Sequence, residues 1–321
     1  MAARRGTSKS KSSRRAGPSL PLWLVGALIL ALIVAVAVRL KVAPPGRRPP
    51  APRPPEEAPK KPAKTKPRAA VHPTPAEEPE TPSPAPGARP LPVAPRSPAG
   101  IPTVALVIDD VGYRMDLVEE ALRDLPPSVT FAVIPFLPFS KESAERAHEA
   151  GFPVILHCPM EPEHPERWKP TQGTLTLGLP PPEVRQILLT DLSAVPHAEG
   201  INNHMGSLAT SDRPLMEAVM ETLKSEGLYF LDSRTTVRTV AYETARARGV
   251  KAAFRSVFLD DADEEGAIMR QFDQLVARAG QEGMLVGIGH LRPRTIAVMA
   301  QRIPYWSGRG VDFVPLREVV R

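Results

Sequence analysis

The stretch VALVIDD, residues 104–110, places five uncharged apolar residues directly before two aspartates. Short apolar runs of this kind recur along the C-terminal two thirds of the chain, and segments with helical spacing separate them. Repeated units of this type, with fully apolar strands, predict an α/β fold in which helices cover a parallel sheet. The predicted strands are Val104–Ile108, Val129–Ile134, Val154–Leu156, a shorter one at Ile201, Tyr229–Leu231, Ala252–Phe254, Met284–Ile288 and Val311–Val314. The predicted helices are Met115–Leu125, Ser140–Ala150, Pro182–Val195, Pro214–Glu226, Val240–Arg248, Glu264–Ala279 and Arg294–Arg302.

The number of these units narrows the architecture. About eight strand–helix units predict a (β/α) barrel, closed or partly open. A doubly wound open sheet is the alternative. Glycines lie just past four of the predicted helices, as a left-handed C-cap requires, which supports the helix ends: Gly151, Gly227, Gly249 and Gly283.

Ionisable side chains follow six of the predicted strands. In parallel β/α folds the carboxyl ends of the strands open on one face, and ligands bind there. Aspartates after a strand often cap a helix, but capping does not account for two aspartates and three histidines at equivalent strand ends. The residues concerned are Asp109 and Asp110, His157 with Glu161 beyond it, His204, Asp232, Arg255 and His290.

These residue types suit one kind of chemistry. One carboxylate and two imidazoles are suitable ligands for Zn²⁺ or a similar divalent ion, which lowers the pKa of bound water and polarises a carbonyl. A second carboxylate can then accept the proton of the water, and a histidine can protonate a leaving amine. The pattern predicts metal-assisted hydrolysis of an amide or ester. The sequence has no G-x-S-x-G, no P-loop and no G-x-G-x-x-G after a strand, so serine-hydrolase, ATPase and dinucleotide-binding readings lack support.

The order and spacing of these motifs resemble the polysaccharide deacetylases (carbohydrate esterase family four), and most closely the divergent polysaccharide deacetylase family of bacterial envelopes. The resemblance covers about residues 102–321 and implies the distorted or partly open (β/α) barrel of that family. The motifs that carry it are VIDD (107–110), SVTFAVIP (128–135), GFPVILHCPME (151–161), NNHMGS (202–207), FLDS (230–233) and IGH (288–290).

The resemblance implies roles for individual residues. Asp109 corresponds to the base, Asp110 and His157 to metal ligands, and His290 to the acid that protonates the leaving group. Asp232, in the fourth motif, is a candidate to orient and charge-stabilise a histidine.

The chain departs from the family pattern at two motifs. Glu161 stands where the family has its second metal-binding histidine, so either Glu161 or His204 must complete the site. We rank His204 first, because it follows a different strand, whereas Pro159 prevents a regular helix from bringing His157 and Glu161 together. The arginine of the third motif, which orients the base, is missing, and Arg255 is a candidate substitute.

Two functions are compatible with this reading. The first is a metal-dependent hydrolase that removes N-acetyl or related acyl groups from an envelope or cell-wall glycan. The alternative is a non-catalytic protein with the deacetylase fold that binds an envelope glycan or a protein partner. Retention of about one tightly bound divalent ion would favour the enzyme.

The N-terminal third predicts an anchor and a spacer. Residues 1–19 hold six Lys and Arg and no acid, and the nineteen residues 20–38 carry no charge. About 20 apolar residues span a bilayer, and a basic flank stays cytoplasmic, so we expect a single-pass anchor in the cytoplasmic membrane with the C-terminal domain exported. A cleaved signal peptide is the alternative. Residues 39–100 are rich in proline and have no apolar periodicity, which predicts a disordered linker to a folded domain at 101–321.

The charge distribution limits the partners of that domain. Residues 1–99 carry a net charge of +13, whereas residues 100–321 hold 23 Lys and Arg against 30 Asp and Glu, a net charge of −7. An acidic domain argues against a nucleic-acid partner. The single cysteine excludes an intrachain disulfide and a multi-cysteine zinc site.

The predicted anchor can be tested by topology mapping. A reporter fused after Arg321 should be active only on the exported side of the membrane, because six basic residues precede the apolar run. Cell fractionation should recover the full-length chain with the membrane. Recovery of a soluble, N-terminally processed form as the main species would contradict the anchor and favour a cleaved signal.

Overall fold

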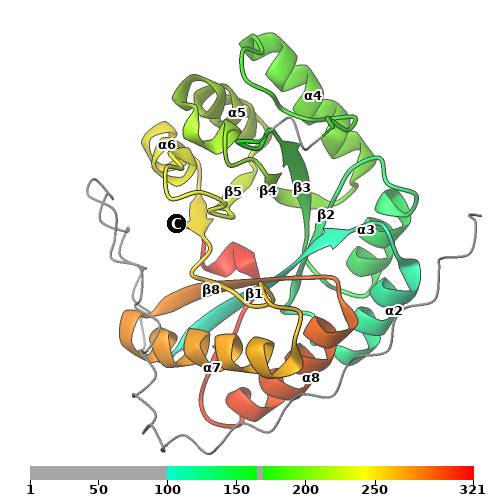
Figure 1. The fold of residues 1–321 in the computed structure, drawn as a ribbon, viewed down its shortest axis with the longest axis vertical. Helices are drawn as coiled ribbons and strands as arrows, with labels where there is room; N and C mark the ends of the chain where they lie inside the picture. The colour runs from blue at the N-terminus through cyan, green and yellow to red at the C-terminus, as the bar shows by residue number, and fades with distance from the viewer. Residues whose placement is uncertain (1–99, 165–168) are drawn as a thin grey trace, which may run out of the picture. The chain divides into compact units, whose positions relative to one another are not determined.

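The computed structural model describes residues 100–164 and 169–321, which are coloured in Figure 1. The predicted basic segment 1–19, the predicted membrane span 20–38 and the predicted linker up to residue 99 lie outside the described residues. Within the described ranges, no helix is long and apolar enough to cross a membrane.

The strands form one parallel sheet that curls into a half barrel. Its strand order is β6-β5-β4-β3-β2-β1-β8-β7, and β9 pairs with β1 off this path. Strands β6 and β7 are the two ends, so the predicted partly open barrel is confirmed and the doubly wound alternative is wrong. The strands are β1 (Thr103–Val111), β2 (Thr130–Val133), β3 (Val154–Met160), β4 (Ala198–Met205), β5 (Tyr229–Asp232), β6 (Ala252–Phe254), β7 (Val257–Phe258), β8 (Met284–His290) and β9 (Asp312–Phe313).

Helices between the strands cover the outer face of the half barrel (Figure 1). Local signals in the sequence set their ends. In α5 the side chain of Asp212 accepts a hydrogen bond from Leu215 N, Pro214 lies in the first turn, and Gly227 ends the helix at φ 72°. The helices are α2 (Met115–Asp124), α3 (Ser140–Glu149), α4 (Pro181–Ala194), α5 (Arg213–Glu226), α6 (Ala241–Arg248), α7 (Glu265–Glu282) and α8 (Pro293–Ser307).

The sheet is buried on both faces, which explains its apolar strands. Alternate residues of β1 point to opposite sides, so Leu106 packs in the cluster with the helices and Val107 in a second cluster on the inner face. The C-terminal segment fills that inner face with Leu316 and Val320, and the backbone of Arg321 pairs with that of Ala252.

Two strands differ from the sequence prediction. Only Ile201 marked β4, but the strand has eight residues because the buried Asn202 and Asn203 hydrogen-bond to side chains and backbone of neighbouring segments. Strand β7 was not predicted, because two residues give no readable periodicity. Both strands end at the face where the ionisable residues gather.

One buried carboxyl group lies in α4, on the helix-covered side of the sheet. Asp191 is fully buried, and neither of its carboxyl oxygens has a hydrogen-bond partner. A Cβ atom on Gly173 would lie 2.2 Å from Asp191 Oδ1, so the loop backbone packs directly against the carboxyl. Burial raises the pKa of Asp191 to about 8, because no donor or cation compensates for the lost hydration of the charged form.

We expect this group to make the domain less stable at alkaline pH. The folded-state pKa lies above the unfolded value of 3.8, so the free energy of unfolding falls as the pH rises from about 4 to about 8. Between pH 5 and pH 9, wild type should lose on the order of 4 kcal/mol that Asp191→Asn does not lose, measured by urea unfolding. Leu188→Ala in the same helix should destabilise equally at both pH values. An equal pH slope in wild type and Asp191→Asn would contradict the assignment.

Candidate metal and catalytic site

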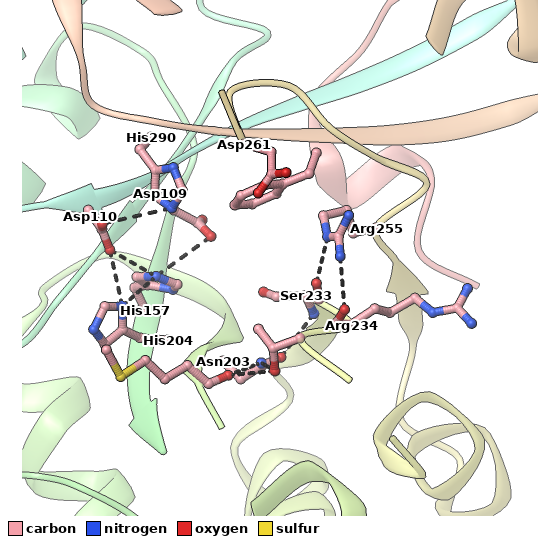
Figure 2. A pocket seen from close by; sticks show the side chains of 13 residues that line it. Asp109, Asp110, His157, Asn203, His204, Ser233, Arg234, Arg255, Asp261 and His290 are labelled. Atoms are coloured by element: carbon pink, nitrogen blue, oxygen red, sulfur yellow. Dashed lines mark hydrogen bonds and ion pairs between the residues drawn. The ribbon is translucent and has the colours of Figure 1, made fainter. Parts of the chain in front are cut away.

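A cavity of about 460 Å³ opens where the parallel strands end (Figure 2). It collects side chains from β1, β3, β4, β8 and the segments that follow β5, β6 and β7. Six of the eight residues predicted from the sequence line it: Asp109, Asp110, His157, His204, Arg255 and His290. The carboxyl ends of the parallel strands therefore bring these six side chains to one face, as the sequence predicts.

Three of these side chains form a compact group. His204 Nδ1 lies 3.1 Å from Asp110 Oδ1 and 3.2 Å from His157 Nε2, and His157 Nε2 lies 3.4 Å from Asp110 Oδ1. Tetrahedral ligands at about 2.0–2.1 Å from Zn²⁺ would be about 3.3–3.4 Å apart. The Asp110 Oδ1 atom is buried without a hydrogen-bond partner, so it is available to a cation. The donor set and its spacing fit a divalent metal.

An asparagine that the sequence reasoning did not single out orients this group. Asn202 Oδ1 lies 2.8 Å from His157 Nδ1, while Asn202 Nδ2 donates to Asp109 Oδ1 at 2.9 Å and to Ser233 Oγ at 3.1 Å. Because the amide nitrogen faces two acceptors, its oxygen must face a donor, which is the Nδ1–H of His157. The lone pair of His157 is thus on Nε2, directed at the metal-binding group.

The backbone of β1 brings two adjacent aspartates into one cavity. Successive side chains of a regular strand point to opposite faces. Here the pairing of β1 with β2 shifts register between Ile108 and Val111, and Asp110 has a left-handed φ of 60°. A non-glycine residue in this region costs about 1–3 kcal/mol, and such strained positions cluster at functional sites. The irregularity turns Asp110 toward His157 and His204, while Asp109 also faces the cavity (Figure 2).

The two aspartates differ in their electrostatics. Burial, with the neighbouring charge of Asp110, raises the pKa of Asp109 above its usual value and outweighs the opposing effect of His157. Burial also raises the pKa of Asp110, but the adjacent imidazoles of His157 and His204 outweigh burial and hold this pKa far below its usual range. Asp109 is therefore suited to take up a proton, and Asp110 to remain an anionic ligand.

His290, at the end of β8, is held by a second carboxylate. Its Nδ1 lies 2.9 Å from Asp260 Oδ1, and Asp260 Oδ2 accepts hydrogen bonds from His290 N and Thr295 Oγ1. Burial lowers the pKa of His290, but Asp260 outweighs burial and the net shift is upward. His290 Nε2 faces the cavity, 3.8 Å from Asp110 Oδ2. The sequence reasoning missed Asp260 because it follows the unpredicted β7.

Two predicted residues do not join the cavity. Glu161 Oε2 accepts a hydrogen bond from Leu177 N at 2.8 Å, so it organises a loop instead of completing the metal-binding group. Asp232 accepts from Arg234 N and Thr239 Oγ1, which fixes the turn after β5. The carboxylate that orients a histidine is Asp260 and not Asp232.

Arg255 lines the cavity but does not hold the predicted base. Its guanidinium donates to the carbonyl oxygens of Ser233 at 2.7 Å and Arg234 at 2.8 Å. The direct hydrogen bond to Asp109 comes from Asn202. The side chain that contacts Asp109, as expected for Arg255, is therefore the neutral amide of Asn202 on β4.

Comparison with known proteins agrees with the sequence motifs. Residues 106–320 match the family model described as divergent polysaccharide deacetylase. The uncharacterized protein YibQ of Escherichia coli is 38% identical over 200 residues, which are 62% of this chain and 62% of YibQ, less than two thirds of its length. An uncharacterized protein of Haemophilus influenzae is 38% identical over 196 residues, covering 61% of this chain and 69% of that protein.

A solved structure also shares the fold. The crystal structure of the uncharacterized protein ATU2773 from Agrobacterium tumefaciens superposes with a TM-score of 0.66 at 26% identity, covering 71% of this chain and 93% of that one. The resemblance stated from the motifs is confirmed.

The orienting role of Asn202 can be tested through metal affinity. Asn202→Ala should weaken binding of Zn²⁺ by about 10–100-fold, because His157 loses the acceptor that fixes its tautomer. Isothermal titration of chelator-stripped protein with Zn²⁺ measures the effect. Tyr229→Phe is a matched control, since it removes a side-chain hydrogen bond from the buried Tyr229 to Glu199, at the other end of the strands. Equal affinity of Asn202→Ala and wild type would show that the amide does not orient the ligand.

Proposed function

This chain belongs to the divergent polysaccharide deacetylase family, and we propose that it is a metal-dependent hydrolase that removes N-acetyl or related acyl groups from a glycan of the cell envelope. One observation carries the proposal: three ligand atoms lie within 3.4 Å of one another, with a carboxyl group of raised pKa and a carboxylate-bound histidine beside them.

Asp110, His157 and His204 would hold the divalent ion, which we expect to be Zn²⁺ or an ion of similar preference. The bound ion would supply Lewis-acid polarisation of the acyl carbonyl and a lowered pKa for water beside it. The positions of the remaining groups then determine how protons move.

Asp109 is the general base of the proposed reaction. Its Oδ1 is occupied by the Asn202 amide, which leaves Oδ2 directed toward the group, 3.6 Å from His157 Nε2. A base works best when its pKa approaches the working pH, and burial shifts Asp109 in that direction. As the oxygen of water bonds to the acyl carbon, its proton passes to Asp109.

His290 is the general acid. Asp260 binds Nδ1 and favours the protonated ring, so Nε2–H is available on the cavity side. When the bond between the acyl carbon and nitrogen breaks, this proton passes to nitrogen, and the products are a free amine on the glycan and a carboxylic acid. Each acid–base group is expected to contribute about 10²–10⁴-fold to the rate.

The predicted N-terminal anchor would place this reaction outside the cytoplasm. The predicted proline-rich linker would reach at most roughly 170 Å at about 3.1 Å per residue, which would let a tethered domain act on a polymer away from the membrane. The envelope glycan is therefore the substrate class that both the fold and the predicted location support.

Two variants distinguish the proposed base from a proposed metal ligand. Asp109→Asn should retain the metal and lose about 10²–10⁴-fold in rate, whereas His204→Ala should lose metal and rate together. Metal content by mass spectrometry and acetate release from N-acetylated wall fragments measure the two effects. Equal turnover by wild type and Asp109→Asn would refute the mechanism. If the metal-loaded wild type binds acetylated glycans but releases no acetate from any of them, the non-catalytic alternative replaces the enzyme.

A further inference from the structure

Two arginines line the cavity without a carboxylate partner. Elsewhere in this acidic domain arginines commonly pair with acids, as Arg146 does with Glu119 and Arg302 with Asp273. Within the described residues, Arg234 and Arg255 form no ion pair although both line the cavity. In Figure 2 Arg255 lies across the cavity from the three histidines, and the Arg234 side chain extends beyond it, away from the cavity.

Backbone and aromatic contacts hold Arg255 in place. Its Nε and Nη2 atoms donate to the carbonyls of Ser233 and Arg234, and its Cζ lies 4.8 Å from the ring centroid of Phe258. Among the described residues, Nη1 has no hydrogen-bond partner. The guanidinium is thus immobilised with donors left over, which reduces the entropy cost of binding an anion.

The backbone of Arg234 is also held in place. Its φ of 50° is left-handed, and this backbone is clamped because its N–H donates to Asp232 Oδ1 while its carbonyl accepts from Arg255. Its Cζ lies 4.9 Å from the ring of Phe254. Backbone strain maintained by surrounding contacts is a feature of ligand-binding positions.

The positive charges of Arg234 and Arg255 repel each other, and a bound anion would relieve this repulsion. Burial lowers the pKa of Arg255, and the next largest cause is the positive charge of Arg234. The nearby carboxylates of Asp232, Asp109 and Asp261 act in the opposite direction, but none forms an ion pair with Arg255. Arginine donors match the planar oxygens of carboxylate, sulfate and phosphate, and such charge-assisted bonds are strong.

We propose that Arg234 and Arg255 recognise an anionic substituent on the sugar next to the acylated one, so that the substrate is an acidic glycan. The inference rests on the proposed function, which places the acyl group beside the histidines. Arg255 and Arg234, which line the opposite side of the same cavity, then lie on the side of the neighbouring sugar. Carboxylate, sulfate and phosphate share the chemistry that would be recognised.

Pairs of probes that differ only in an anionic group separate the effect of the charge on binding from that of the sugar. The probes are N-acetylglucosamine oligosaccharides whose neighbouring sugar carries a carboxylate, a sulfate or a phosphate, each with a counterpart that lacks the anion. Calorimetric titration of the zinc-loaded full chain in detergent should show at least one anionic probe binding about tenfold more tightly than its counterpart. This preference should weaken as salt is raised.

Variants assign the preference to the arginines. Arg234→Gln should reduce it to less than about threefold, and Arg234→Lys should retain part of it, since Lys keeps the charge without the planar donors. Arg309→Gln is the matched control, because Arg309 also stacks on an aromatic ring and bonds a carbonyl but lies outside the cavity. Arg255→Gln is a second test, with thermal unfolding to verify the fold.

The outcomes separate this inference from the hydrolase proposal. Equal binding of all anionic probes and their counterparts, or a preference that survives both Arg234→Gln and Arg255→Gln, overturns the inference. If charged and neutral probes bind equally and both release acetate, the hydrolase stands and the acidic-glycan inference fails. If an arginine-dependent preference is found but no probe releases acetate, the acidic-glycan inference stands and the hydrolase fails.

Discussion

Successive side chains of a regular β-strand point to opposite faces, but here two successive aspartates of β1 point into one cavity. Asp109 and Asp110 both face it because β1 loses its regular pairing with β2 at their positions and Asp110 takes a left-handed conformation. The regular register of β1 with β8, which pairs Asp109 with His290, is kept on the other side. One local irregularity therefore sets the proposed base, Asp109, beside the proposed acid, His290, and turns a candidate metal ligand, Asp110, toward two histidines. The strain must be offset by the sheet around it, which is buried on both faces.

A single amide links the proposed base to the candidate metal-binding group. Asn202 contacts Asp109 through its nitrogen and His157 through its oxygen, so the orientation of each depends on the other. Such a bridge allows one side chain to fix both a tautomer and a carboxylate rotamer. It also explains why β4 tolerates two buried asparagines in a strand that otherwise faces the core. Their polar atoms are paired, and burial without partners would be costly.

The sequence predicted the parallel half barrel well, because apolar strands and helical spacing are local signals. It also predicted which strand ends carry Asp109, Asp110, His157, His204 and His290, since parallel topology brings such ends to one face. The failures concern side-chain direction and short elements. Glu161 was a reasonable ligand by its motif position, but its carboxylate turns to the loop at Leu177. Asp260 follows a two-residue strand, which is too short to recognise in the sequence. The contacts of the Asn202 amide leave no periodic pattern, so only its place next to a predicted strand marked Asn202.

The neutral partner of Asp109 has a consequence for the whole cavity. In the motif that the chain resembles, an arginine orients the base, and a cation at that place would favour the ionised carboxylate and lower its pKa. Here an amide holds Asp109, so burial dominates and raises the pKa of this carboxyl. Positive charge is instead placed on the segments after β5 and β6, where Arg234 and Arg255 are fixed by aromatic rings and carbonyls. In the proposed function, proton transfer and substrate recognition therefore fall to different residues. The proposed base lies beside the candidate metal-binding group, and the guanidinium groups are the proposed contacts of the neighbouring sugar.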